Sequence, residues 1–257
     1  MGKLGLTTFG LTQDQAIGHL AMLVFSALVA GSFSLGSMAA PHIDPAALNA
    51  ARFWLGAGLL STIAVATGRF DRRAFVAPWR FLILGGLFGI YFVMMFEGLK
   101  TAPPVSAAAV FTLTPIVTGL AAWVLLRQVM TFRIAAALAI GGAGAVWVIF
   151  RADLNAILNF QIGKGEITYF WGCVSHAIYT PMVRKLNRGE NPIIFTVGML
   201  IAGGIILSIY GGPAILATDW SALPLIVWIT LAYTRSLPAR RLLCCCRSAR
   251  CGCHRPR

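Results

Sequence analysis

Arg52 and Glu97 are charged residues that lie inside long apolar stretches of this 257-residue chain. A charge inside a bilayer is costly and therefore points to function. Arg52 lies six residues into one apolar run and Glu97 near the end of the next, so we expect them at comparable depth. They could form an ion pair, or each side chain could reach separately to the polar surface. In a third interpretation, Glu97 contacts a substrate or a proton directly.

A histidine, His176, falls near the middle of another apolar run. An imidazole exchanges protons near neutral pH, so His176 could line a substrate cavity. The alternative is a neutral histidine that is hydrogen-bonded to a neighbouring helix. Trp171, Ser175 and Tyr179 are expected near one helical stripe with it, because residues four apart share a helix face. These four residues form a second candidate site.

A proline sits deep in the apolar stretch KTAPPVSAAAVFTLTPIVTG, residues 100–119. Pro115 frees the backbone carbonyl one turn earlier, near Phe111, and bends the helix axis. Thr112 or Thr114 can satisfy the backbone there. The alternative is that proline is frequent in membrane helices anyway. We expect a bend that serves function.

The composition places these residues in a membrane. Hydrophobic residues make up 58% of the chain and charged residues 11%, with a mean hydropathy of +0.79. Soluble domains carry roughly 25% charged residues, and a transmembrane helix needs about 20 apolar residues. Seven such runs occur: Ile17–Ala39, Ala46–Thr67, Phe81–Leu99, Val105–Leu126, Phe132–Phe150, Ile167–Val183 and Ile193–Gly211. An eighth, Ala222–Tyr233, stops after 12 residues. The sequence predicts an all-α integral membrane bundle of seven full helices and one partial transmembrane helix.

The distribution of Lys and Arg predicts the orientation. With residues 1–16 in the cytoplasm, the inner segments hold 10 basic residues and the outer segments hold 4. The positive-inside rule therefore favours a cytoplasmic N-terminus. The net charge of +13 includes seven arginines from residues 235–257, and it does not indicate a nucleic-acid partner.

Residues 235–257 break the pattern with an Arg- and Cys-rich tail. In one interpretation its cysteines and His254 bind a metal, although zinc sites usually have a folded loop between ligand pairs. In another, the cysteines are palmitoylated beside the membrane. We favour a third, in which the tail is an out-of-frame translation and the protein is cut short, and we predict no metal site. The cysteines concerned are Cys244, Cys245, Cys246, Cys251 and Cys253.

Two helix pairs share a spacing of 11 residues between matching positions. These positions are Ser34, Pro45 and Gly56 in the first pair, and Pro181, Pro192 and Gly203 in the second. The pairs are five helices apart, so the copies would enter the membrane in opposite directions. Inverted repeats are typical of secondary transporters. We therefore expect a first five-helix repeat in residues 17–150, an incomplete second repeat in 151–234, and a parent protein of ten helices.

Four stretches in order carry a family resemblance over roughly residues 17–234. They are HIDPAALNAARFWLGAGLL, FEGLKTAPPVSAAAVFTLTPIVTGLAAWVLL, AAALAIGGAGAVWVI and GEITYFWGCVSHAIYTPMVRKL. This set resembles the EamA-like branch of the drug/metabolite transporter superfamily. The resemblance implies a permease of the bacterial-type inner membrane, often an exporter. It would carry small metabolites or amino-acid-like solutes by alternating access, without a cofactor or a hydrolytic motor.

The resemblance also implies partners and further site residues. It places Tyr91, Ser32 and Ser34 in the substrate cavity, although each residue type more often serves packing. The partners would be a small-molecule substrate, membrane lipid and a proton as coupling ion. The glycine-rich helix around Gly141 and Gly144 is expected to serve close packing, with a homodimer interface as the alternative.

Two other function classes stay open. A membrane-embedded enzyme is disfavoured because the sequence contains no H-E-x-x-H and no G-x-S-x-G motif. The other class is a transport-incompetent remnant of a carrier, which the tail after Thr234 favours over a working carrier.

Overall fold

The computed structural model describes residues 13–68, 75–128, 130–150, 153–155 and 162–233. Those residues form helices joined by short connections, and no strand occurs among them. The helices are α1 (Gln13–Ala39), α2 (Pro45–Ala66), α3 (Trp79–Leu99), α4 (Pro104–Phe111), α5 (Thr114–Leu126), α6 (Phe132–Ile149), α8 (Lys164–Leu186), α9 (Pro192–Tyr210) and α10 (Gly212–Ala217). A last helical segment covers residues 225–233.

The helices have the dimensions of membrane spans. Five helical stretches are long and apolar enough to cross a bilayer: α2, α3, α4 together with α5, α6 and α9. Two more, α1 and α8, have 27 and 23 residues and so the length of a span. The predicted fold class, a helical membrane bundle, is confirmed.

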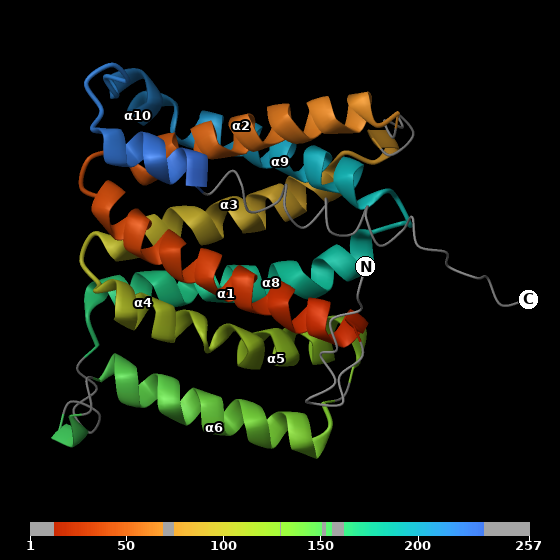
Figure 1. Cartoon of the computed structure of the whole chain (residues 1–257), viewed down its shortest axis with the longest axis vertical. Helices are drawn as coiled ribbons and strands as arrows, with labels where there is room; N and C mark the ends of the chain where they lie inside the picture. The colour runs from red at the N-terminus through yellow and green to blue at the C-terminus, as the bar shows by residue number, and fades with distance from the viewer. Residues whose placement is uncertain (1–12, 69–74, 129, 151–152, 156–161, 234–257) are drawn as a thin grey trace, which may run out of the picture.

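The bundle is organised around α3. Figure 1 shows the long helices side by side, with α3 between α2 and α9 on one side and α8 on the other. At the far edge, α6 packs mainly against α4 and α5 and buries little of its own surface. Its Gly141 and Gly144 face open space, and the homodimer interface suggested for this helix stays a prediction.

Polar caps and prolines fix where two corresponding helices begin. The Asp44 carboxylate accepts a hydrogen bond of 2.8 Å from the backbone N–H of Ala46, just before Pro45 opens α2. Asn191 accepts one of 3.0 Å from the N–H of Ile193, and Pro192 opens α9. An Asx cap followed by proline is a strong helix start, because proline needs no donor in the first turn. These helices run in opposite directions, as the inverted repeat requires, but the repeat stays a prediction.

Glycines let the central helices touch backbone to backbone. A Cβ added at Gly85 of α3 would lie 2.5 Å from the backbone nitrogen of Gly203 in α9. Another, added at Gly98, would lie 2.7 Å from the carbonyl oxygen of Gly165 in α8. Small residues permit this approach in membranes, where close packing rather than water drives helix association.

Several sequence predictions fall outside the described residues. Residues 1–12 and 235–257 are among these, so the structure says nothing about the metal, lipid and reading-frame interpretations of the tail. The residues concerned are Cys244, Cys245, Cys246, Cys251, Cys253 and His254.

Candidate functional site

The fourth membrane span is interrupted at mid-length. It divides into α4 and α5 at Thr112 and Leu113, and Pro115 lies in the first turn of α5. Proline has no N–H, so the carbonyl of Phe111 lacks its usual partner one turn later. The Thr112 hydroxyl donates to the carbonyl of Ala109 at 2.6 Å and takes part in closing α4.

A cavity of about 830 Å³ lies beside this interruption, between α5, α6 and α8. One wall carries hydroxyl groups at Thr112, Thr114, Thr118 and Thr180. Apolar side chains line the rest of the cavity, among them Ile134 and Leu138 of α6. A mostly apolar cavity with a few polar groups is the usual form of a small-molecule site, for which volumes of about 300–1,000 Å³ are common.

Two buried polar atoms in the cavity lining have no partner within the described part of the chain. They are Oγ1 of Thr114 and Nδ1 of His176. Thr114 is only 5% exposed, and its neighbour Cys173 carries a thiol, which is a weak hydrogen-bonding group. A buried polar atom without a partner costs about 1–3 kcal/mol. A solute that bonded to these atoms would recover that energy.

Aromatic rings surround His176 on its bundle side. Its ring centroid lies 4.7 Å from that of Tyr91, 5.8 Å from Tyr179, 5.9 Å from Phe111 and 6.3 Å from Phe88. These rings pack around the imidazole, and among them Phe111 also lines the cavity. The Tyr91 hydroxyl is engaged away from the cavity, 3.3 Å from the Tyr169 hydroxyl.

A positively charged side chain, that of Arg184, lies at the other end of the cavity. Nη1 of Arg184 donates to Oε1 of Gln128 at 3.3 Å, and both exposed residues line the cavity where α5 ends. Gln128 is its one hydrogen-bond partner in the described ranges. Because Arg184 lies two helical turns beyond His176 on α8, the separation is about 12 Å along the helix axis.

Two residues predicted with His176 serve packing between helices. Ser175 is buried and donates to the carbonyl of Leu87 at 2.8 Å, which links α8 to α3. The Tyr179 hydroxyl donates to Sδ of Met199 at 3.0 Å, and its ring stacks on Phe88 with centroids 4.9 Å apart. Neither lines the cavity.

Other predicted site residues lie away from the cavity. The Trp171 side chain is 58% exposed and points out of the bundle. Ser34 is exposed, and its carbonyl accepts from the Ser37 hydroxyl at 2.9 Å, whereas Ser32 is half-buried on α1. Among the predicted residues, the structure brings His176 and Pro115 together at the cavity.

The structure does not bring Arg52 and Glu97 together. Glu97 lies near the surface and pairs with Lys100, with 2.7 Å between Oε2 and Nζ. Arg52 donates from Nη1 to Oδ1 of Asn49 at 2.9 Å, and its guanidinium lies 4.4 Å from the ring centroid of Phe92. A cation over an aromatic face is stabilised by the ring quadrupole. Glu97 is therefore paired with Lys100 just after α3, and Arg52 has its partners, Asn49 and Phe92, inside the bundle.

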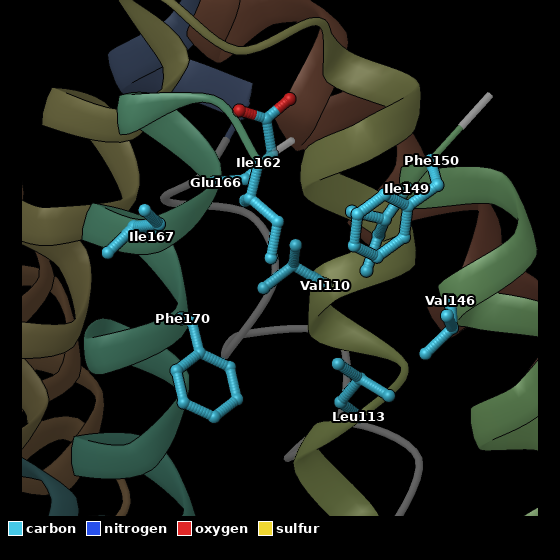
Figure 2. A pocket seen from close by; sticks show the side chains of 9 residues that line it. All are labelled: Val110, Leu113, Val146, Ile149, Phe150, Ile162, Glu166, Ile167 and Phe170. Atoms are coloured by element: carbon cyan, nitrogen blue, oxygen red, sulfur yellow. The ribbon is translucent and has the colours of Figure 1, made fainter. Parts of the chain in front are cut away.

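A second, smaller cavity of about 470 Å³ lies between α4, α6 and α8. Its lining is apolar except for Glu166 in the first turn of α8, whose carboxylate points away from the apolar side chains in Figure 2. An acid in the first turn of a helix stabilises the positive end of the helix dipole. This role accounts for Glu166, and we assign no chemistry to this cavity.

The sequence analysis missed the polar lining of the larger cavity. Thr118, Thr180, Gln128 and Arg184 line it, and none was singled out as a site residue. Thr180 and Arg184 follow His176 at intervals of four, so the helical stripe continued toward the C-terminus would have found them. No group of three His, Cys, Asp or Glu side chains that could hold a metal occurs in the described segments.

Comparisons with known proteins agree with this architecture. The model of the EamA-like transporter family matches residues 16–150, just over half of the chain. The uncharacterized transporter YyaM of Bacillus subtilis (strain 168) is 25% identical over 218 residues, which are 84% of this chain and 71% of that protein. A solved structure described only as the crystal structure of a protein matches with a TM-score of 0.53 and 21% identity. The matched region covers 81% of this chain and 71% of the chain in that structure. At that identity the likeness shows the fold alone.

Proposed function

This chain belongs to the EamA-like transporter family and is a membrane transporter, and on that premise we propose that it moves a small solute through the cavity beside Thr114 and His176. The solute is a small metabolite or an amino-acid-like molecule. The membrane is a bacterial-type inner membrane, and export is the direction we favour.

One observation carries this proposal. Oγ1 of Thr114 and Nδ1 of His176 are buried in the lining of the same cavity; Nδ1 has no partner among the described residues, and Oγ1 has the weakly hydrogen-bonding thiol of Cys173 beside it. Unpartnered polar atoms inside a membrane are expensive, and they persist where function requires them. A solute with hydrogen-bonding groups fits this pair better than a purely structural role does.

The broken span supports movement by alternating access. Substrate sites of many secondary transporters lie near the midplane and beside discontinuous helices. Here the break at Thr112 and Leu113 separates two short helices, and the carbonyl of Phe111 has no proline N–H to bond, so fewer backbone bonds resist a change of angle there. The wall formed by α5 and α6 buries little surface, so its displacement disturbs the α3–α8–α9 core least.

The orientation belongs to the same proposal. The exposed Arg127 and Arg184 lie at the end of the bundle that the positive-inside rule assigns to the cytoplasm. The cavity mouth at Arg184 would then face the cytoplasm, where an exporter collects its solute. His176 is the titratable group at the opposite end of the cavity, and we assign proton coupling to it.

The test is uptake by proteoliposomes with a defined mixture of organic acids, amino acids and amines outside. Mass spectrometry of the vesicle contents identifies what enters. We expect at least one solute to accumulate above empty liposomes, and His176→Phe to reduce that accumulation. Ile140→Ala is the matched control, because Ile140 is 76% exposed on α6 and does not line the cavity. This variant should transport normally. An imposed pH gradient should change the rate if a proton is coupled.

Two results would overturn the proposal. One is a wild-type protein that is folded in the liposomes but accumulates none of the mixture. The other is transport that His176→Phe leaves unchanged, because the cavity would then not be the path.

A further inference from the structure

We propose that the solute is an amphipathic anion whose carboxylate binds at Arg184 and Gln128 while its apolar body lies along α5 and α6. This inference rests on the function proposed above and names the substrate class of the same cavity.

The first argument, for a negatively charged end group on the solute, comes from the charges of the cavity lining. Arg184 supplies the lining's one positive charge, and the described lining contains no Asp or Glu. The Arg184 guanidinium carries five N–H donors, and one donates to Gln128 among the described residues. A planar fork of donors matches a carboxylate, which accepts two parallel hydrogen bonds.

The second argument, for an apolar body of the solute, comes from the apolar part of the lining. Between Arg184 and His176 the cavity is walled by Ala122, Ile134 and Leu138, together with Leu126 and Met130. This surface favours an apolar body and disfavours a compact, fully polar ion such as phosphate. The hydroxyls of Thr118 on α5 and Thr180 on α8 also line this part of the cavity.

The third argument, for the length of the solute, comes from the spacing of residues along α8. Arg184 and His176 are separated by about 12 Å along the helix axis. A molecule with its carboxylate at Arg184 and an apolar body of several carbons would reach the buried Thr114 and His176. A cationic amine in the same position would meet Arg184 and be repelled.

The experiment compares three probes that share a phenyl ring on a short alkyl chain and differ at one end: 4-phenylbutyrate, its amide and 4-phenylbutylamine. Binding to the full chain is measured by calorimetry in nanodiscs of neutral phosphatidylcholine. We expect the carboxylate to bind about tenfold more tightly than the amide, and the amine to bind more weakly than both. Arg184→Gln should abolish this preference, and Arg184→Lys should retain part of it.

Lys185→Gln is the matched control, because it removes the adjacent positive charge, which does not line the cavity. The carboxylate preference should survive in Lys185→Gln. A second variant, Ala122→Phe, fills the cavity without removing a polar group and should weaken binding of the carboxylate.

Each contrary outcome has one meaning. Equal or tighter binding of the amide or the amine overturns the anion inference and leaves the proposed function standing. Binding that Ala122→Phe does not weaken places the probe outside the cavity and overturns the anion inference, whereas the proposed function is tested separately by the liposome experiment. Loss of probe binding in nanodiscs that contain anionic phosphatidylglycerol would assign Arg184 to a lipid headgroup, which also overturns the inference.

Discussion

Arg80 and Glu190 form an ion pair with 2.7 Å between Nη2 and Oε1, although the Arg80 side chain is only 2% exposed. Arg80 lies in the first turn of α3, and Glu190 lies in the connection between α8 and α9. Nη1 of Arg80 also donates to the carbonyl of Leu186 at 2.8 Å, at the end of α8. One buried guanidinium therefore links α3 to the end of α8 and to the connection that leads into α9.

The first prediction concerns the strength of this pair. Removing one partner of a buried ion pair leaves the other charge unpaired, which costs about 3–5 kcal/mol. We expect Glu190→Gln to lower the free energy of unfolding by about 3 kcal/mol, because Glu190 remains 12% exposed. Thermal unfolding in detergent measures the effect.

Lys100→Gln is the control for that prediction. It breaks the Glu97–Lys100 pair, whose side chains are 51% and 34% exposed. An exposed pair contributes less than about 1 kcal/mol. Equal losses of stability in the two variants would contradict the role of burial.

The second prediction follows from the titration of Glu190. Burial alone would raise the pKa of Glu190, but hydrogen bonds from Arg80 and from the backbone N–H of Arg188 outweigh it and hold the pKa below the ordinary value of 4.5. A carboxyl with a lowered pKa in the folded state stabilises the protein above its unfolded value, and this stability is lost as the pH falls. Wild-type stability should therefore drop below about pH 4.5, and Glu190→Gln should reduce the drop. The same drop in both proteins would assign it to other groups.

The third prediction separates function from stability at Thr114. Valine has the shape of threonine without the hydroxyl, so Thr114→Val removes a buried polar atom whose neighbour, the thiol of Cys173, bonds it only weakly. We expect the free energy of unfolding to rise by about 1 kcal/mol. Transport of the solute identified in liposomes should fall by about three- to tenfold, because one hydrogen bond to it is lost. A variant that is less stable and transports normally would show that the hydroxyl serves the fold.

The fourth prediction tests the backbone contact between α3 and α9. A Cβ at Gly85 would meet the backbone of Gly203, which cannot move aside as a side chain could. We expect Gly85→Ala to destabilise the protein by about 1–3 kcal/mol through overpacking. Gly58→Ala, at a helical position with nothing within 4 Å, should be neutral or slightly stabilising. Unfolding curves of the two variants make the comparison, and identical curves would rule out the close contact.

The spans could be predicted from the sequence because apolar runs bounded by prolines define them. The run Ala46–Thr67 corresponds to α2, Pro45–Ala66, and the run Ile193–Gly211 corresponds to α9, Pro192–Tyr210. Length and hydropathy suffice for this, since a bilayer requires about 20 apolar residues. The site of the break in the fourth span also followed from one residue, Pro115.

The site was harder to predict than the spans. Sequence spacing shows which residues share a helix face, but it does not show whether that face meets the bundle interior or the lipid. Trp171 was expected near the stripe of His176, yet Trp171 points outward while His176 lines the cavity. Membrane helices are apolar on every side, so the sequence carries little sign of which side meets other helices. Glu97 shows a second limit. Its partner Lys100 lies one turn away in the same chain segment, and depth alone did not reveal that pair.

The most direct measurement is the accessibility of the cavity from each side of the membrane. All six cysteines are first replaced, and Thr118→Cys then places one thiol in the cavity wall. A charged maleimide that cannot cross the membrane is added to right-side-out and to inside-out vesicles. Lys185→Cys, on the exposed end of α8, should react from one side, and Ile140→Cys, on the outer face of α6, from neither. Alternating access through this cavity predicts that Thr118→Cys reacts from both sides, with rates that the transported solute lowers. Reaction from one side only, unchanged by the solute, would contradict the central claim.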